Sequence, residues 1–438
     1  MKIPLHKPLW GKRAEDAILH AMRSGSGVAD GPESQAMRTG LKKVTGAKFA
    51  LPVTSCTHAM EAAVACLGAK IGDEVIVPSF TLAATATAVM IRGARPVFAD
   101  IDPVTYCLDP NDVELRITKR TVGIITVHYA GMAGPAFDAL LRLAKEHKLW
   151  VIEDAAHCIG SWYQPGAEVG IASRDRNFLA PLLPSTHPRK TRDRSGQAQD
   201  AARVYPESFE GKRSAKILSR VALQGKHLGT FGQVGALSFH GTKNVAAGEG
   251  GAILTNNKTL ADKLEVFRAI GTDRQAFLQG KVSIYQWVGE GSSYMLSDLL
   301  ASLVNIQLDQ IDRINKDRNH IASEYATSLK GLRLPIQLPF VPSGMTKPNW
   351  HIYALKFPNT GMRKKFMTAM REKHVEVSTH YVPLHISPMG RKFLKKGQKL
   401  PVTDEVGRTL VRMPIYAGMT ERELEYVVST AKKALQRL

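Results

Sequence analysis

Cysteine is scarce in this sequence, with four residues among 438, and no two of them have the spacing of metal ligands. A zinc site or a disulfide framework is therefore not expected, and four reduced thiols in a cytoplasmic protein are the simplest prediction. The first ten residues lack the apolar core of a signal peptide, and the longest apolar stretch, residues 81–91, is too short to cross a bilayer. We expect no bound metal and no membrane insertion.

Acidic side chains are also in short supply: 39 Asp and Glu residues stand against 59 Lys and Arg, a formal net charge of +20. Such a surplus is compatible with nucleic acid, an acidic membrane surface or a small anionic substrate. No RNA- or DNA-binding motif accompanies the charge, so nucleic-acid binding is not expected. The length and a hydrophobic content of 44% instead predict a globular protein with one large and one small domain.

One segment, residues 164–223, differs from the rest of the chain. It has few aromatic residues and no clear periodicity, and it contains eleven Lys and Arg residues against six Asp and Glu. A segment of this length without a pattern is typical of an exposed, largely unfolded insertion. A docking arm for an acidic partner is the alternative.

Apolar runs alternate with helical patterns through the first half of the chain. Alternation of buried strands with helices predicts an α/β domain with a mainly parallel sheet, whose ligands bind where the strands end. The expected strands are residues 74–80, 95–101, 122–130 and 149–156, and the expected helices are residues 56–67, 82–92 and 134–148.

The pattern changes in the second half of the chain, where long helical periods dominate. We expect a large domain over residues 1–310 and a small C-terminal α+β domain over residues 311–438. The expected helices here are residues 260–269, one long helix at 297–329 and a terminal helix at 420–438, and the strand-like stretches are residues 350–357 and 375–382.

The strongest chemical signal lies in residues 234–252. A strand-like run, residues 234–239, ends in a polar turn, Lys243 follows, and a glycine-rich segment, residues 248–251, comes next. A lysine where a buried strand ends is placed for a lowered pKa, and its neutral amine reacts with an aldehyde. A solvated loop lysine is the ordinary alternative, so Lys243 needs support from elsewhere in the chain.

Three further groups provide this support. Thr54–Thr57 follows a short strand, and small hydroxyl residues there either cap a helix or bind a phosphate. Asp154 closes an apolar strand, where its carboxylate either forms a local cap or ion pair or bonds a protonated ring nitrogen, and His157 follows it. Ser238 adds a second hydroxyl beside Lys243. A phosphate cup, a ring-nitrogen partner and a reactive lysine are what pyridoxal 5′-phosphate (PLP) requires.

In these residues the chain resembles the DegT/DnrJ/EryC1/StrS family of PLP-dependent sugar aminotransferases. The resemblance covers nearly everything except residues 164–223. It implies fold type I, the fold of aspartate aminotransferase, with a mostly parallel sheet in the large domain, and a homodimer with shared active sites. The motifs that carry it are IPLHKP (3–8), TSCT (54–57), GDEVIVPS (72–79), HYAG (128–131), EDAAH (153–157), SFHGTKN (238–244), GEGG (248–251), GSSYMLSD (291–298) and HYVPLH (380–385).

Within the family, the chain looks most like the branch that aminates C4 of dTDP-4-dehydro-6-deoxy-D-glucose. L-Glutamate is the amino donor in that branch, and the product, dTDP-4-amino-4,6-dideoxy-D-galactose, enters surface polysaccharide. The resemblance implies that Lys243 attaches the cofactor and moves a proton, that Asp154 pairs with the pyridine nitrogen, and that His157 lies against the ring. It also places the cofactor phosphate at Ser55, Cys56 and Ser238, and the substrate near Tyr381 and His385.

The chain departs from the family pattern at two places in the expected site. Many relatives have an Asn-Tyr-Arg stretch, contributed by the partner subunit, where this chain has Ser293, Tyr294 and Met295. Ser293 then replaces the asparagine as a phosphate contact, and the arginine contact is lost. Where many relatives stack an aromatic residue on the cofactor ring, this chain has Leu82, with Phe80 two residues earlier.

Three alternatives stay open at this stage. The same chemistry on another nucleotide keto sugar is the nearest. A PLP-dependent dehydratase shares the fold, but its known examples replace the lysine with histidine, so Lys243 argues against it. A non-catalytic regulator that binds nucleic acid through the positive charge would take up no PLP, and its affinity would fall steeply with salt.

Overall fold

The computed structural model describes residues 1–24, 29–166, 225–330 and 336–438. The predicted insertion, residues 164–223, therefore lies almost entirely outside the described residues, and its exposure stays a prediction. Within the described ranges, no helix is both long enough and apolar enough to cross a membrane. The same residues contain no group of His, Cys, Asp and Glu side chains arranged to hold a metal ion.

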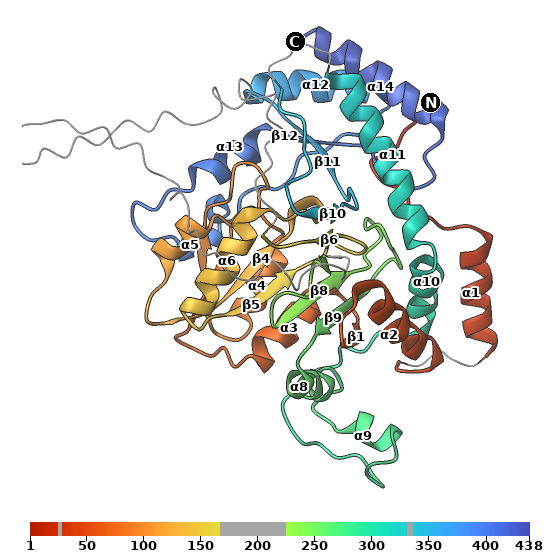
Figure 1. Ribbon diagram of the computed structural model, residues 1–438, viewed down its shortest axis with the longest axis vertical. Coiled ribbons are helices and arrows are strands. Elements are labelled where there is room, and N and C mark those ends of the chain that lie inside the picture. Colours follow the sequence, from red (N-terminus) through yellow and green to blue (C-terminus); the bar gives the residue numbers. More distant parts are fainter. Residues whose placement is uncertain (25–28, 167–224, 331–335) are drawn as a thin grey trace, which may run out of the picture. The chain divides into compact units, whose positions relative to one another are not determined.

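A seven-stranded sheet forms the centre of the described structure, in the order β1-β9-β8-β5-β4-β2-β3 (Figure 1). The pairs β3–β2, β2–β4, β4–β5 and β5–β8 are parallel, whereas β9 is antiparallel to both β1 and β8. The prediction of a mainly parallel sheet is thus confirmed. The strands are β1 Phe49–Val53, β2 Glu74–Pro78, β3 Arg95–Ala99, β4 Thr121–Val127, β5 Trp150–Asp154, β8 Val234–Ser238 and β9 Gly251–Thr255.

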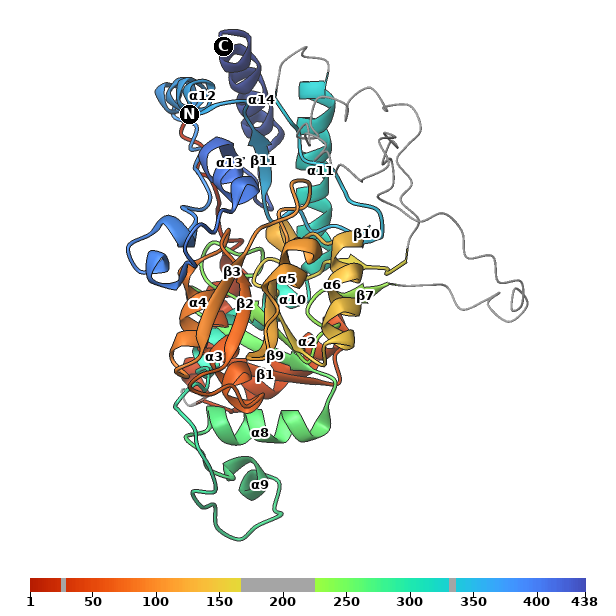
Figure 2. The same cartoon turned by 90° about the vertical axis from the view of Figure 1, so that its left-hand side faces the viewer.

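Both faces of the sheet are buried, which explains why its strands read as continuous apolar runs. Successive side chains point to opposite faces, so Ile124 and Ile125 of β4 belong to different hydrophobic clusters. Figure 2 shows α3 and α4 on one side of the sheet and α6 on the other. The first face carries α3 Cys56–Cys66, α4 Ala83–Met90 and α8 Lys258–Arg268; the second carries α2 Pro32–Thr45, α5 Pro110–Arg116, α6 Pro135–Glu146 and α10 Asp298–Leu308, with α1 Lys12–Arg23 against α10.

A second hydrophobic core is built by the C-terminal elements. Its two strands are antiparallel, with Tyr353 opposite Met413. The N-terminal Ile3 is buried in the same core, next to Val375. The terminal helix starts with a capping box, in which Thr420 and Glu423 each bond the other's backbone N–H. The elements of this core are α11 Ile311–Lys330, β11 Tyr353–Lys356, α12 Thr360–Glu372, β12 Leu410–Met413 and α14 Glu421–Gln436, whereas α13 Pro401–Thr409 places Val406 in a separate cluster with Phe80.

Two sequence-based expectations for this half are wrong. The predicted single helix over residues 297–329 is two helices, α10 and α11, because the first packs on the central sheet and most of the second on the C-terminal core. The predicted strand at 375–382 forms only two isolated bridges, Val375 with Ile3 and Ser378 with Arg412. The two partners come from different parts of the chain, so no continuous strand pairing is formed. The break after α10 falls at the predicted domain boundary, but the described residues form one compact unit, so the two-domain division stays a prediction.

The ends of the predicted insertion lie side by side in a small antiparallel ribbon. Strand β6, Trp162–Tyr163, pairs with β7, Lys226–His227, and Tyr163 is directly opposite Lys226. Strand β10, Met345–Lys347, covers the other edge of β6. The chain therefore leaves and re-enters the described structure at one place, as the two strands of a hairpin do.

We predict that the insertion is dispensable for folding. Replacing residues 164–225 with Asn-Gly would join Tyr163 to Lys226 through a two-residue hairpin turn, which this register accepts. The circular dichroism spectrum should be unchanged, and the melting temperature should shift by less than about 4 °C. An insoluble product, or a melting temperature lowered by more than about 10 °C, would contradict the prediction.

Candidate active site

The predicted site residues come together because their strands end at the same edge of the sheet. Asp154 is the last residue of β5 and pairs with Ala236 of β8, which ends two residues later at Ser238. Gly251, the first residue of β9, pairs with both Ser238 and Val53, the last residue of β1. The end of β1 leads directly into α3, so the hydroxyl turn, the acidic residue and the second serine share one edge, as predicted.

Asp154 is a buried carboxylate with defined partners. Its oxygens accept hydrogen bonds from the Ala156 N–H at 3.2 Å and the Thr85 hydroxyl at 3.0 Å, and the Cys56 sulfur lies 3.9 Å away. Burial raises the pKa of the Asp154 carboxyl, whereas these two hydrogen bonds and the Lys243 ammonium act in the opposite direction. A carboxylate of this kind is suited to bond a protonated ring nitrogen.

Lys243 lies where the turn after β8 closes, with its N–H donated to the His240 carbonyl at 2.9 Å. Burial lowers the pKa of the Lys243 ammonium to about 8, although the Asp154 carboxylate opposes this shift. The two side chains interact electrostatically, yet they are absent from the ion pairs that the described residues form. Lys243 therefore has an amine that is neutral in an appreciable fraction of molecules near neutral pH.

His157 forms one wall of the site together with two other histidines. Its ring centroid is 4.3 Å from that of His351 and 6.3 Å from that of His380. Burial lowers the pKa of His157 and of His351 well below the usual value, so both rings are neutral. The Nδ1 atom of His157 is buried and has no hydrogen-bond partner among the described residues, which leaves it available to a bound polar group.

The predicted phosphate residues are together at the start of α3, but their side chains differ in availability. The Ser55 Oγ caps α3 by accepting the His58 N–H at 3.1 Å. The Cys56 thiol points to the Ala236 carbonyl, 3.4 Å away, so its backbone N–H is the group left for an anion. A Cβ atom on Gly251 would collide with the backbone of Ser55 and Cys56, so this close approach requires glycine.

The remaining predicted residues are either exposed or already in contact with other protein groups. Ser293 is exposed and forms an isolated bridge with Ala269, and its role as a phosphate contact stays a prediction. Tyr381 stacks on His380 with ring centroids 3.6 Å apart. Both ring nitrogens of His385 bind protein groups, Nδ1 the Ser79 hydroxyl at 2.7 Å and Nε2 the Asp404 carboxylate at 3.2 Å, so its substrate role is less favoured.

The position at which many relatives stack an aromatic residue lies at the surface in this chain. Leu82 is 60% exposed, whereas Phe80 is fully buried. Phe80 packs among three tyrosines, Tyr106, Tyr129 and Tyr381, at the rim of the site. This wall, rather than Leu82, supplies the aromatic surface next to the histidines.

Sequence reasoning missed residues that the C-terminal core contributes. Arg412 of β12 donates to His380 Nε2 at 3.2 Å, and its charge acts on Lys243 and His157. Burial, with Arg412 acting in the same direction, lowers the pKa of His380 to about 2. No local motif marks Arg412 or His351, because only the packing of the second core brings them to the sheet edge.

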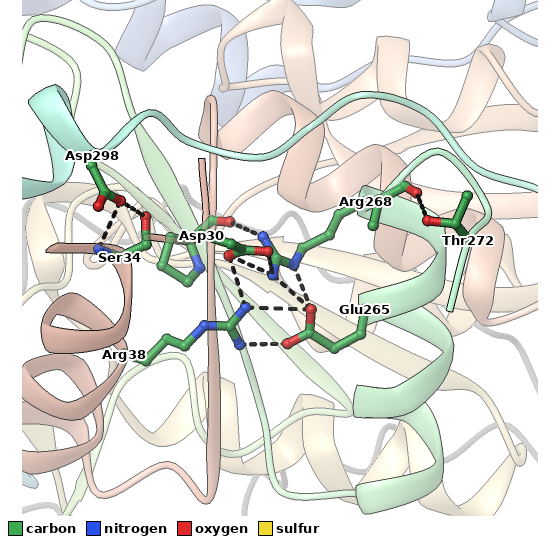
Figure 3. Close-up of polar contacts among 9 residues, drawn as sticks. Asp30, Ser34, Arg38, Glu265, Arg268, Thr272 and Asp298 are labelled. Atoms are coloured by element: carbon green, nitrogen blue, oxygen red, sulfur yellow. Dashed lines mark hydrogen bonds and ion pairs between the residues drawn. The ribbon is translucent and has the colours of Figure 1, made fainter. Parts of the chain in front are cut away.

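A buried ion cluster supports β1 just ahead of the hydroxyl turn (Figure 3). The guanidinium of Arg268 is fully buried and binds Asp30 at 2.6 Å and Glu265 at 2.7 Å. It also donates to the Pro52 carbonyl in β1 at 3.2 Å. Arg38 binds the same two carboxylates from the other side. The bond from Arg268 to Pro52 therefore ties a group of mutually paired buried charges to the strand that leads into α3.

These features fit PLP: a helix N-terminus with hydroxyl residues for the phosphate, a buried carboxylate for the ring nitrogen, an unpartnered histidine nitrogen and a lysine with a lowered pKa. The fold and this edge of the sheet define a PLP-dependent transferase of fold type I. The sequence model of the DegT/DnrJ/EryC1/StrS aminotransferase family matches residues 9–175 and 218–432. The chain belongs to this family of PLP-dependent aminotransferases, and the unmatched residues 176–217 lie within the predicted insertion.

Similar proteins extend over the whole chain. The spore coat polysaccharide biosynthesis protein SpsC of Bacillus subtilis is 28% identical over 98% of this chain and 96% of its own. DesV of S. venezuelae, solved with a ketimine intermediate, is 25% identical with a TM-score of 0.77, covering 100% of this chain and 99% of its own. The PLP form of a putative sugar aminotransferase, Spr1654 of Streptococcus pneumoniae, is 19% identical with a TM-score of 0.78, covering 100% of this chain and 99% of its own, and it supports the fold.

The pH dependence of covalent PLP uptake should reflect the lowered pKa of Lys243. Since only the neutral amine reacts, the uptake rate of cofactor-free protein should rise with pH and level off above about 8, rather than near the 10.4 of an ordinary lysine. Asp154 raises the lysine pKa, so Asp154→Asn should move the midpoint to lower pH. Stopped-flow absorbance of the lysine-bound cofactor measures both curves; a wild-type midpoint close to 10 would refute the assignment. The other groups whose charge acts on Lys243 are Cys56, Cys158 and Arg412.

Proposed function

We propose that the protein transfers an amino group from L-glutamate to C4 of a nucleotide-linked 4-keto-6-deoxyhexose. The specific substrate is dTDP-4-dehydro-6-deoxy-D-glucose, and the product is dTDP-4-amino-4,6-dideoxy-D-galactose, a precursor of surface polysaccharide. The observation that carries the proposal is Lys243, whose pKa is lowered to about 8 and whose charge interacts with the buried Asp154 carboxylate and with the neutral His157.

Each residue of the site has a role in this transfer. Bound PLP supplies an electron sink for the bond changes at the carbon that gains or loses nitrogen. Asp154 holds a proton at the ring nitrogen and so keeps the ring electron-poor. Lys243 moves a proton at the carbon undergoing transfer, because its pKa allows the amine both to take and to release one near neutral pH. His157 is neutral, its Nδ1 has no hydrogen-bond partner in the described part of the chain, and it orients the ring.

The amino donor requires a receptor for its carboxylate, and Arg412 is the candidate. Its guanidinium donates to His380, and its Nε is buried without a hydrogen-bond partner among the described residues. Guanidinium groups bind carboxylates through two parallel hydrogen bonds. We assign Arg412 to the α-carboxylate of L-glutamate, with His380 fixing the orientation of the guanidinium.

A sugar substrate is supported by the similar proteins. SpsC is described as a spore coat polysaccharide biosynthesis protein, and Spr1654 as a putative sugar aminotransferase. The motifs SFHGTKN, AAGEGGA and GSSYMLSD favour the branch that acts at C4 of the dTDP sugar. The net charge of +20 suits a nucleotide diphosphate. The same transfer to another nucleotide keto sugar, at C3 or with the gluco configuration, is the nearest alternative.

The Lys243→Ala variant tests the proposed function directly. It should fold and lose turnover by at least about 1,000-fold, because no other amine of the site substitutes for Lys243. The assay supplies dTDP-4-dehydro-6-deoxyglucose and L-glutamate and identifies the amino sugar by NMR. Lys43→Ala, at an exposed lysine of α2, is the matched control and should retain full activity.

The outcomes separate the alternatives. Turnover of Lys243→Ala within about tenfold of wild type would refute its role. If the NMR spectrum identified a different amino sugar as the product, the amino transfer would be supported and the assigned sugar substrate would be wrong. Wild-type protein that takes up no PLP, and whose nucleic-acid affinity falls steeply with salt, would favour the regulator.

We also propose a homodimer, in which the segment around Ser293 serves the partner's site. The chain between α9, Arg274–Leu278, and Ser293 exposes large apolar side chains that a monomer would leave in water. Trp287 is 82% exposed and Tyr285 50%. Burial of these side chains against a second copy would bring Ser293 next to the dimer interface.

Trp287→Glu should weaken this dimer, because burying a carboxylate in an apolar contact is unfavourable. Light scattering at low micromolar concentration should give a dimer for wild type and a monomer for the variant. Leu115→Glu is the matched control, since Leu115 is 80% exposed on α5 at a distance in sequence from this segment. A monomeric wild type, or a dimer unaffected by Trp287→Glu, would count against the interface.

A further inference from the structure

A buried polar network behind the catalytic edge joins residues that the proposed mechanism uses separately. It is centred on a short segment, residues 348–351, between α11 and β11. Asn349 is fully buried and His351 is 5% exposed. His351 is one of the three histidines in the wall of the site, Asn349 lies behind that wall, and both are outside the motifs found in the sequence.

The network reaches Lys243 through its neighbour in the chain. The Asn244 side-chain oxygen lies 2.9 Å from His351 Nδ1, and the Asn244 side-chain nitrogen donates to the Asn349 carbonyl at 3.1 Å. Because the amide nitrogen is the donor to Asn349, the amide oxygen is an acceptor, and His351 Nδ1 carries the hydrogen. Both ends of the amide are therefore occupied, and the residue next to Lys243 has one orientation.

The network reaches His157 in two ways. The Asn349 side-chain nitrogen donates to the His157 carbonyl at 2.7 Å and the Ile159 carbonyl at 3.0 Å. The His351 ring lies against the His157 ring, with an interplanar angle of 34°. One set of bonds fixes the backbone of His157, and the ring contact fixes the plane of its imidazole.

The segment itself is held in an unusual conformation. Trp350 has a φ of 45°, a left-handed value that costs energy for a bulky residue. The carbonyls of four consecutive residues, 348–351, each accept a side-chain hydrogen bond, two of them from the buried Arg318 of α11. A Cβ atom on Gly131 would collide with the Asn349 side-chain amide, so glycine at this position leaves room for the amide. So many restraints on one strained turn are typical of a functional constraint.

We propose that His351 and Asn349 are positioning residues, which hold Lys243 and His157 in one fixed geometry through Asn244 and the histidine ring contact. The inference deepens the proposed function, because it concerns the same reacting lysine. Precise placement matters since a misplacement of about 1 Å at a reacting group costs roughly 100-fold in rate. The lowered pKa of His351 is consistent with this role, because a neutral ring adds no charge beside Lys243.

Two substitutions of one residue separate positioning from packing. The side-chain nitrogen of asparagine can occupy the place of histidine Nδ1, so His351→Asn keeps the donor to Asn244. His351→Phe keeps a flat ring against His157 and removes the donor. We expect kcat to fall by about 30-fold in His351→Phe and by less than about threefold in His351→Asn, whose smaller loss reports the missing ring contact alone, with the KM values little changed. His147→Phe, at an exposed histidine that ends α6, is the matched control and should behave as wild type.

A double-mutant cycle tests the hydrogen bond between His351 and Asn244 by changing Asn244. Asn244→Leu should lower kcat by at least as much as His351→Phe, because it also removes the bond to the Asn349 carbonyl. The double variant should lower kcat no further than Asn244→Leu alone, since both changes break the bond between Asn244 and His351. Competitive acetylation of the cofactor-free full chain, read by mass spectrometry, gives the titration midpoint of Lys243. We expect it to rise above the wild-type value of about 8 in His351→Phe as water reaches the ammonium.

The outcomes are distinct. Equal losses in His351→Phe and His351→Asn, or single effects that multiply in the double variant, would overturn the inference. If His351→Phe does not fold, Asn244→Leu compared with His351→Asn decides the question in the same way. A wild-type protein without the visible band of lysine-bound PLP would refute the proposed function instead, and the acetylation midpoints would still test the network.

Discussion

The structure depends on keeping one ammonium and one carboxylate close together in a site that is largely shielded from water. Asp154 is buried at the end of β5, and Lys243 sits at the turn after β8, which is the next strand in the sheet. Burial disfavours the charged form of both groups, and their mutual attraction partly offsets that cost. The result is a lysine whose charge changes near neutral pH, which an exposed lysine would not provide.

The remaining electrostatics of the site come from the second core. Arg412 lies on β12 and donates to His380, and His351 lies two residues before the start of β11. Positive charge from Arg412 favours the neutral forms of Lys243 and of the histidines. The central sheet thus supplies the lysine and its carboxylate, and the C-terminal elements adjust the charge around them and present a receptor for an acidic donor.

The sequence allowed the central sheet to be predicted because buried parallel strands leave a simple local signal, an apolar run that ends in polar residues. Asp154 ends such a run and Lys243 lies in the turn that follows another, so their proximity could be inferred. Arg412 and His351 could not be found in this way, since their partners lie far away in the chain. The long helix at 297–329 was predicted wrongly because apolar spacing does not reveal which of two cores each half packs against.

The insertion does not need to disturb the catalytic edge, because a buried anchor separates the two. Glu153, beside Asp154 but on the opposite face of β5, accepts N–H bonds from Gly229, Phe231 and Gly232 at 2.7–2.8 Å and pairs with His128 at 2.8 Å. Burial opposes charge on His128, yet its hydrogen bonds and Glu153 raise its pKa to about 9, so the pair is ionised. The chain that returns from the insertion is therefore fixed to β5 before it enters β8. Added length beyond β6 and β7 costs only loop-closure entropy, which grows slowly with length, and leaves the strand that carries Ser238 in register.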